Sequence, residues 1–165
     1  MSPDDIVVAI VALNGGELVG RTRLQKAAFL LEEIGMNSGL EFDYHRYGPF
    51  SADLAAGWDE AYAEGRLKLS ERLGSHEVPY TIFSANMTPP ARLGDLDADK
   101  ARDLLSTLQR YSDVVVELAA TIVYLRQHGF HETALDEVKV RKPLKATDDR
   151  LKKATDLISC LNLTD

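Results

Sequence analysis

The segment Tyr47-Gly48-Pro49-Phe50-Ser51 constrains the fold most strongly, because it must end an extended stretch and begin a helix. Gly48-Pro49 is a dipeptide typical of turns. Ser51 is a favourable N-cap, which predicts a helix over residues 52–64. The preceding residues, 41–47, alternate in polarity and predict a short strand. The apolar face expected for the helix consists of Leu54, Trp58, Ala61 and Tyr62.

Two helices are predicted before this segment and a hairpin after it. Residues 3–13 have acidic side chains in their first turn and are followed by Asn14-Gly15-Gly16, a helix stop. Residues 22–34 have helical apolar spacing, and residues 67–82 alternate around a turn, as a hairpin does. This order of elements is typical of a winged helix-turn-helix, with the hairpin as the wing. Residues 1–88 are therefore predicted to form a winged-helix-like part.

The second half of the chain, residues 95–165, is predicted to be helical and to pack on the first half as one compact domain. A linker containing Pro89-Pro90 separates the two parts. Apolar residues with 4-3-4-3 spacing from Leu104 to Leu125 favour one long or slightly kinked helix, although Ser112 could instead cap a second helix. We interpret this seam as internal core, with a homodimer interface as the alternative. Two shorter helices are expected, over residues 132–140 and after Thr147.

These elements predict a mainly α, α+β fold with a winged-helix-like core, a small antiparallel sheet and a C-terminal helical bundle part. The helix at 52–64 occupies the place of a recognition helix, yet it has no Lys or Arg before Arg66. It carries Asp53, Asp59, Glu60 and Glu64 instead. Since phosphate contacts dominate affinity for DNA, this helix is a poor DNA reader. The net charge of −7 likewise argues against non-specific binding to nucleic acid or to anionic membranes.

Large aromatic side chains beside an arginine are common anchors of protein interfaces. Tyr44, Tyr47 and Phe50 next to Arg46 have this composition, and the acidic Asp53, Glu60 and Glu64 could meet a basic surface on a partner. These seven residues are the predicted partner-binding site. The alternatives are that the aromatic residues seal the core and that the acidic stripe is an ordinary solvated face.

DNA binding by a winged-helix regulator is the alternative function. Basic side chains on the second helix and on the wing could contact phosphates without the helix at 52–64. The candidates are Arg21, Arg23, Lys26, Lys68 and Arg72.

The sequence favours a protein that is not an enzyme and has no cofactor. It contains none of the common nucleotide-binding, hydrolase or metalloprotease motifs. His128 and His131 are separated by Gly129 and have no further metal ligands nearby, so no metal site is predicted. Cys160 is expected to be a small buried side chain rather than a nucleophile. A single cysteine and an acidic N-terminus predict a cytoplasmic protein with no membrane association.

Three segments resemble the Panacea (SocA-like) antitoxin family and its small uncharacterised relatives. Residues 20–31, GRTRLQKAAFLL, resemble the KLQKLLYF helix of that family, and residues 42–51 are similar to its YGP turn. Residues 132–143 resemble its closing helix and Lys-Pro segment. Ala27-Ala28 departs from the bulkier residues of the family pattern. The resemblance implies a mainly helical domain that neutralises a toxin encoded beside it or delivers a client to a protease, so the expected partner is a protein.

Overall fold

The computed structural model describes residues 1–164 and has a mixed α+β fold in which helices predominate. The helices are α1 (Pro3–Leu13), α2 (Arg21–Leu31), α3 (Ala52–Ala63), α4 (Ala98–Leu108), α5 (Asp113–Gln127), α6 (Ala134–Arg141) and α7 (Asp148–Cys160). The strands are β1 (Glu17–Val19), β2 (Asp43–His45), β3 (Gly48–Phe50), β4 (Lys68–Leu73), β5 (Pro79–Ser84), β6 (Arg92–Leu93) and β7 (Leu96–Asp97). Among the described residues, no helix combines the length and apolar character needed to cross a membrane.

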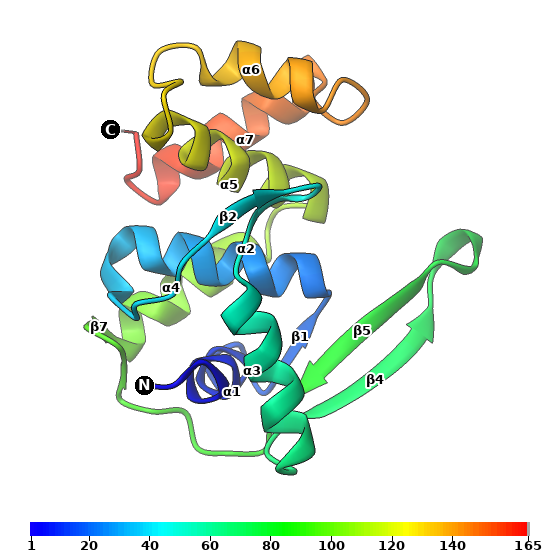
Figure 1. The fold of residues 1–165 in the computed structure, drawn as a ribbon, viewed down its shortest axis with the longest axis vertical. Coiled ribbons are helices and arrows are strands. Elements are labelled where there is room, and N and C mark those ends of the chain that lie inside the picture. The colour runs from blue at the N-terminus through cyan, green and yellow to red at the C-terminus, as the bar shows by residue number, and fades with distance from the viewer. Residues whose placement is uncertain (165) are drawn as a thin grey trace.

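The largest sheet is antiparallel and has the strand order β1-β5-β4. The central strand places Phe83 opposite Leu18 on one side and Leu69 on the other, and Phe83 is fully buried. The predicted hairpin is therefore confirmed as β4 and β5. Its outer half projects away from the helices, so that Leu73 and Val78 are exposed (Figure 1).

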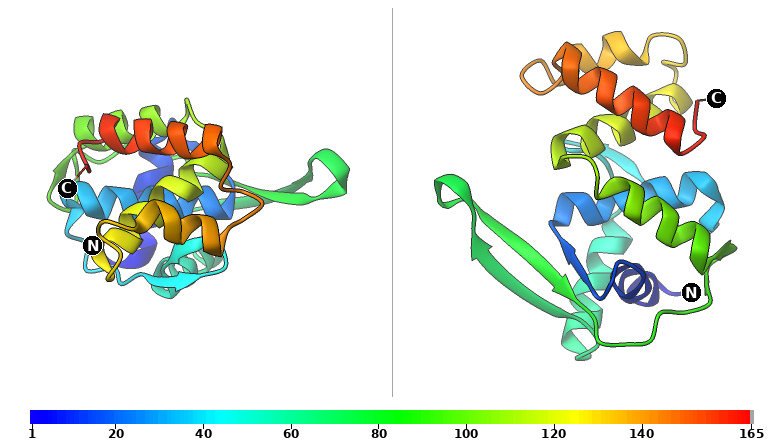
Figure 2. Two further views of the ribbon diagram at one scale, coloured as in Figure 1. Left: turned by 90° about the horizontal axis from the view of Figure 1, so that it is seen from above. Right: turned by 180° about the vertical axis from the view of Figure 1, so that it is seen from behind.

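The hydrophobic core runs without interruption through both halves of the chain. Helix α1 contributes to it along most of its length, since every residue from Ile6 to Leu13 is buried. Helices α2 and α4 cross above α1, and α5, α6 and α7 form the far end of the molecule (Figures 1 and 2). The seam from Leu104 to Leu125 belongs to this core, because most of its side chains are buried within the monomer. Its interpretation as internal packing is thus confirmed.

Gly57 lets α3 approach the start of α1 closely. A Cβ at this position would lie 2.7 Å from the carbonyl carbon of Pro3 and 2.9 Å from the backbone nitrogen of Asp4. Gly57→Ala is therefore expected to lower the free energy of unfolding by about 1–3 kcal/mol, because the overlap outweighs the better helix propensity of alanine. Urea denaturation would measure the loss. Ala56→Leu is the matched control: Ala56 is exposed on the same helix, so added bulk there should change stability little. Equal stability of the Gly57→Ala variant and the unmodified protein would contradict this close packing.

The predicted long helix over residues 104–125 is wrong, and the alternative with two helices is correct. Helix α4 ends at Leu108, and Ser112 caps α5 by accepting a hydrogen bond from the Val115 backbone nitrogen at 3.3 Å. Both helices face the same core, so the apolar spacing continues across the break.

Four further expectations need correction. Gly48-Pro49 is not the turn but part of β3; Arg46 and Tyr47 turn instead, because His45 pairs with Gly48. The helix predicted for 22–34 changes at Leu31 into a wide π-helical turn over Glu32–Met36, where Gly35 has a φ of 113°.

Tyr62, predicted on the apolar face of α3, is 55% exposed, since it lies beside the buried face of α3 rather than on it. Cys160 is exposed too, close to the Tyr111 hydroxyl.

Candidate functional site

Tyr47 lies at the tip of the β2–β3 hairpin and is 45% exposed. Three surface hollows, with volumes of about 510, 400 and 380 Å³, each have Tyr47 in their lining. We use the name Tyr47 surface for six of the side chains that line these hollows. These are Arg21, Arg46, Tyr47, Phe50, Leu144 and Lys145.

The largest of these three hollows, with a volume of about 510 Å³, combines aromatic and cationic walls. Tyr47, Phe50 and the only tryptophan, Trp58, supply its aromatic side, whereas Arg21 and Arg46 supply exposed positive charge. Its remaining lining residues are Thr22, Gln25, Lys26 and His45. His45 stacks on Phe50 with ring centroids 4.6 Å apart, which fixes that side of the hollow.

The third hollow lies between the Tyr47 turn and the connection from α6 to α7. Leu144 projects there with 90% of its surface exposed. The Lys145 ammonium lies 4.7 Å from the centre of the Tyr47 ring, and the Arg46 guanidinium lies 5.6 Å from it. Two cations therefore lie within about 6 Å of the Tyr47 ring centre, the range of a favourable cation–π contact.

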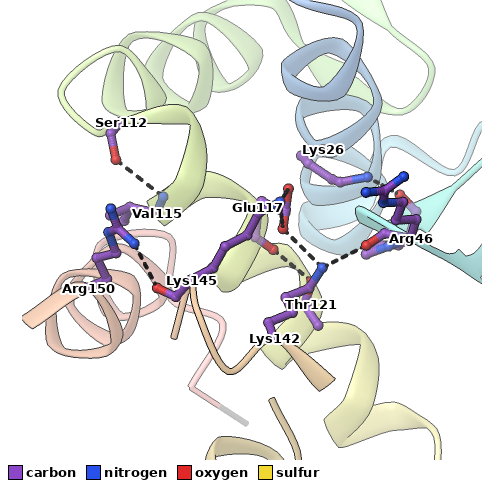
Figure 3. A network of polar contacts seen from close by, with 10 residues as sticks. Lys26, Arg46, Ser112, Val115, Glu117, Thr121, Lys142, Lys145 and Arg150 are labelled. Atoms are coloured by element: carbon purple, nitrogen blue, oxygen red, sulfur yellow. Dashed lines mark hydrogen bonds and ion pairs between the residues drawn. The ribbon is translucent and has the colours of Figure 1, made fainter. Parts of the chain in front are cut away.

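A cluster of charged side chains lies beneath the Tyr47 surface, where α2, α5 and the α6–α7 connection meet (Figure 3). We call Lys26, Glu117, Lys142 and Lys145 the lysine cluster. Three of its members are buried, with exposed fractions of 1% for Lys26, 4% for Glu117 and 6% for Lys142. Glu117 forms ion pairs with Lys142 at 2.9 Å and with Lys145 at 3.0 Å. Lys142 also donates to the Arg46 carbonyl oxygen at 3.0 Å, which ties the cluster to the Tyr47 turn.

Lys26 differs from the other two lysines, because none of the ion pairs within residues 1–164 includes it. Its ammonium donates to the carbonyl oxygen of Pro49 at 2.6 Å. The pKa of Lys26 is lowered from 10.5 to about 8, chiefly because the ammonium is buried; the negative charge of Glu117 opposes this shift, and the positive charges of Lys142 and Lys145 add to it. The folded protein therefore releases the Lys26 proton more readily than the unfolded chain does.

The β3 strand must lie very close to α5 to cover this cluster. Gly48 has a φ of 92°, and a Cβ there would lie 2.5 Å from the Thr121 hydroxyl oxygen. Both the backbone conformation and the space therefore require glycine. Gln25 anchors the end of β3 by donating to the Ser51 carbonyl at 2.9 Å and accepting from the Ser51 backbone nitrogen at 2.8 Å.

The structure brings together three of the seven residues predicted to bind a partner: Arg46, Tyr47 and Phe50. Tyr44 lies elsewhere: the centre of its ring is 6.0 Å from that of Tyr124 and 4.6 Å from the Arg141 guanidinium. Tyr44 therefore helps to pack β2 against α5 and α6.

The predicted acidic residues do not form one group with the aromatic ones. Asp53 is exposed in the first turn of α3, near Phe50, whereas Glu60 and Glu64 lie at the other end of that helix, close to Asp4. These two glutamates and Asp4 could offer oxygen ligands to a cation, but Arg66 already pairs with Asp4 at 2.7 Å and with Glu64 at 3.3 Å. This end of α3 is accordingly a locally compensated charged surface.

The residues predicted to contact nucleic acid do not form one exposed group either. Arg23 points inward and donates to the carbonyl oxygens of Leu108 and Tyr111, so it stabilises the α4–α5 connection. Lys26 is buried in the lysine cluster. The exposed candidates are Arg21, which pairs with Glu71 at 3.5 Å, together with Lys68 and Arg72 on β4.

Sequence reasoning missed the lysine cluster. One signal was Glu117, a lone carboxylate in the apolar run Val114 to Val123. Such a residue inside a core helix needs a buried partner of opposite charge. A second signal was Lys26, which lies three and four residues before the buried Phe29 and Leu30 and thus on the same helix face.

Fold and site together define a mainly helical, mixed α+β protein with a cationic and aromatic surface above a buried lysine cluster. No protein-family model matches the chain. The chain is similar to an uncharacterized protein, YwgA, from Bacillus subtilis (strain 168). The two are 29% identical over 114 residues, which cover 67% of this chain and 68% of YwgA.

Proposed function

We propose that this protein is a non-enzymatic, protein-binding module of antitoxin-like or regulatory type, and that it binds its partner through the Tyr47 surface. The observation that carries the proposal is that three hollows meet at one exposed tyrosine. A tyrosine flanked by arginine and bordered by pockets has the composition and shape of an interface hot spot. The proposed partner is a toxin or regulated client encoded nearby, as the resemblance to Panacea antitoxins implies.

A winged-helix framework accounts for the way this surface is presented. In that interpretation α1, α2 and α3 are the three helices, β1, β4 and β5 form the winged sheet, and the β4–β5 hairpin is the wing. The β2–β3 hairpin is inserted between α2 and α3 and carries Tyr47. The insertion places the aromatic turn against α5 and the α6–α7 connection, away from the acidic end of α3.

DNA binding is less well supported by the charges. The helix in the recognition position, α3, exposes Asp53, Asp59 and Glu60. Two of the five basic candidates, Arg23 and Lys26, have internal roles, and Arg21 is next to Glu71. A phosphate backbone would therefore meet few free cations around α3 and the wing.

Tyr47→Ala is expected to weaken the complex with the partner at least tenfold, in line with a loss of about 2 kcal/mol at a hot spot. The protein would be co-expressed with the product of the adjacent gene, and the complex would be measured by co-purification and calorimetry. Tyr62→Ala is the matched control, because Tyr62 is an exposed tyrosine on α3 outside the Tyr47 surface. It should bind normally.

A growth assay gives the second readout. If the neighbour inhibits growth, the unmodified protein and Tyr62→Ala should restore growth, while Tyr47→Ala should not. No stable complex together with no rescue of growth would contradict the antitoxin-like function. Salt-sensitive binding of duplex DNA that weakens on Arg21→Ala would favour the DNA-binding alternative instead.

A further inference from the structure

We infer that the Tyr47 surface recognises a carboxylate of the protein partner, either an Asp or Glu side chain or a chain terminus, which enters the largest of the three hollows at Tyr47 and lies near Lys26. This inference rests on the proposed protein-binding function and specifies the chemistry of the segment that is bound. Three observations support it: the unbalanced charge of the lysine cluster, the position of Lys26 and the lining of the hollow.

The lysine cluster contains three ammonium groups and only one carboxylate. Glu117 already contacts both Lys142 and Lys145, and the ion pairs within residues 1–164 do not extend to Lys26. A buried charge is costly unless a group of opposite charge lies nearby. The cluster is therefore short of negative charge, and a carboxylate from outside would correct the shortage.

Lys26 is placed where such a group could act on it. Although its side chain is buried, it contributes to the wall of the largest hollow. Arg46 lies at the same hollow and is exposed, so it can attract an anion from solvent, whereas the nearby Arg21 already pairs with Glu71. Among the described residues no ion pair involves Arg46, and its guanidinium is available for a bidentate contact with a carboxylate.

The lining of the hollow favours a side chain with a carboxylate over a nucleic-acid phosphate. Phe50, Trp58 and Tyr47 offer apolar area for the carbon atoms that carry the charged group. In the neighbouring hollow, Glu71 and Asp113 already pair with Arg21 and Arg23, so that wall leaves few cations free for a chain of successive phosphates. A single negative charge within an otherwise apolar segment fits both hollows.

The chemistry can be tested with small probes. Trp58, the only tryptophan, lines the hollow, so its fluorescence reports on occupancy. The probes are 4-phenylbutyrate, its uncharged relative 4-phenylbutyramide and inorganic phosphate. We expect 4-phenylbutyrate to bind with a dissociation constant of about 1 mM, a reasonable affinity for so small a ligand, and the amide to bind at least tenfold more weakly.

Two variants connect the preference to the proposed residues. Lys26→Met and Arg46→Gln should each reduce the difference between acid and amide to less than about threefold, because each removes a cation that faces the carboxylate. Lys68→Met, which changes an exposed lysine on β4, should leave the difference unchanged. Circular dichroism would establish that each variant is folded. If Lys26→Met does not fold, Arg46→Gln still tests the inference.

Several outcomes would overturn the inference. Equal binding of acid and amide, or no response from Trp58, would show that the hollow does not recognise a carboxylate. Tighter binding of inorganic phosphate than of 4-phenylbutyrate, lost on Lys26→Met, would assign the hollow to phosphate groups instead. The Tyr47→Ala measurement with the whole partner is independent of these probes, so failure of the inference can be distinguished from failure of the proposed function.

Discussion

Replacement of Glu117 by glutamine is expected to lower the free energy of unfolding by about 3–5 kcal/mol, the range found when one member of a buried ion pair is removed. Glu117 is the shared counter-ion of Lys142 and Lys145, and both of its oxygens accept hydrogen bonds. Glutamine has nearly the same shape, so the loss comes from charge rather than from a cavity. Lys142 would remain buried without a carboxylate, because its other contact is the Arg46 carbonyl.

Urea denaturation followed by circular dichroism measures this effect. Glu71→Gln is the matched control, since Glu71 pairs with Arg21 in a largely exposed position and should contribute less than about 1 kcal/mol. A double variant, Glu117→Met with Lys142→Met, should recover part of the stability, because it removes the buried Glu117–Lys142 ion pair as a unit and leaves only Lys26 as a buried charge in the cluster. A loss below about 1 kcal/mol for Glu117→Gln would mean that water reaches the lysine cluster and compensates the charges.

Local signals in the sequence were sufficient to predict most helices and the β4–β5 hairpin. The Ser51 and Thr147 caps are confirmed, because each side chain accepts a hydrogen bond from a backbone nitrogen in the first turn of its helix. The turn predicted within residues 67–82 is confirmed at residues 74–78, because the alternation on either side of it fixes the register. In these places the structure depends on residues that are neighbours in the chain.

The misses arise where distant residues decide the structure. Strand β1 has only three residues and exists because β5, more than sixty positions later, pairs with it. The break at Ser112 was hidden because α4 and α5 pack on the same core and so continue one apolar spacing. The aromatic half of the candidate site was predicted from a short segment, Tyr44 to Phe50, whereas the lysine cluster joins residues that are up to 119 positions apart, Lys26 and Lys145.

Lys26 leads to the second large prediction, a stability difference that depends on pH. Its pKa is lowered from 10.5 to about 8, chiefly by burial. Below pH 8 the folded protein therefore holds Lys26 in its charged form, and this buried charge destabilises the fold. The charged groups around it are Glu117 on α5 and Lys142 and Lys145 after α6. A shift of this size corresponds to about 3 kcal/mol, the upper limit of what the ammonium charge costs the fold.

The sign follows from the number of protons bound. As the pH rises from 8 to 10.5, the folded protein releases the Lys26 proton before the unfolded chain does, so the unfolded chain binds more protons. The free energy of unfolding therefore increases with pH in this window. Lys26→Met lacks this titration. The stability of the unmodified protein minus that of Lys26→Met should consequently rise by about 3 kcal/mol between neutral pH and the upper end of the window.

The comparison is best made as a difference, because tyrosines and other lysines titrate in the same range and affect both proteins alike. Urea denaturation at a series of pH values gives the two curves, and Lys68→Met, at an exposed lysine, should run parallel to the unmodified protein. At neutral pH, Lys26→Met should be at least as stable as the unmodified protein, since the removed charge outweighs the lost hydrogen bond to Pro49, worth about 1 kcal/mol. A constant difference across the window would mean that Lys26 keeps an ordinary pKa. In that case the lysine cluster would not be short of negative charge, and the main reason for expecting a carboxylate from the partner would disappear.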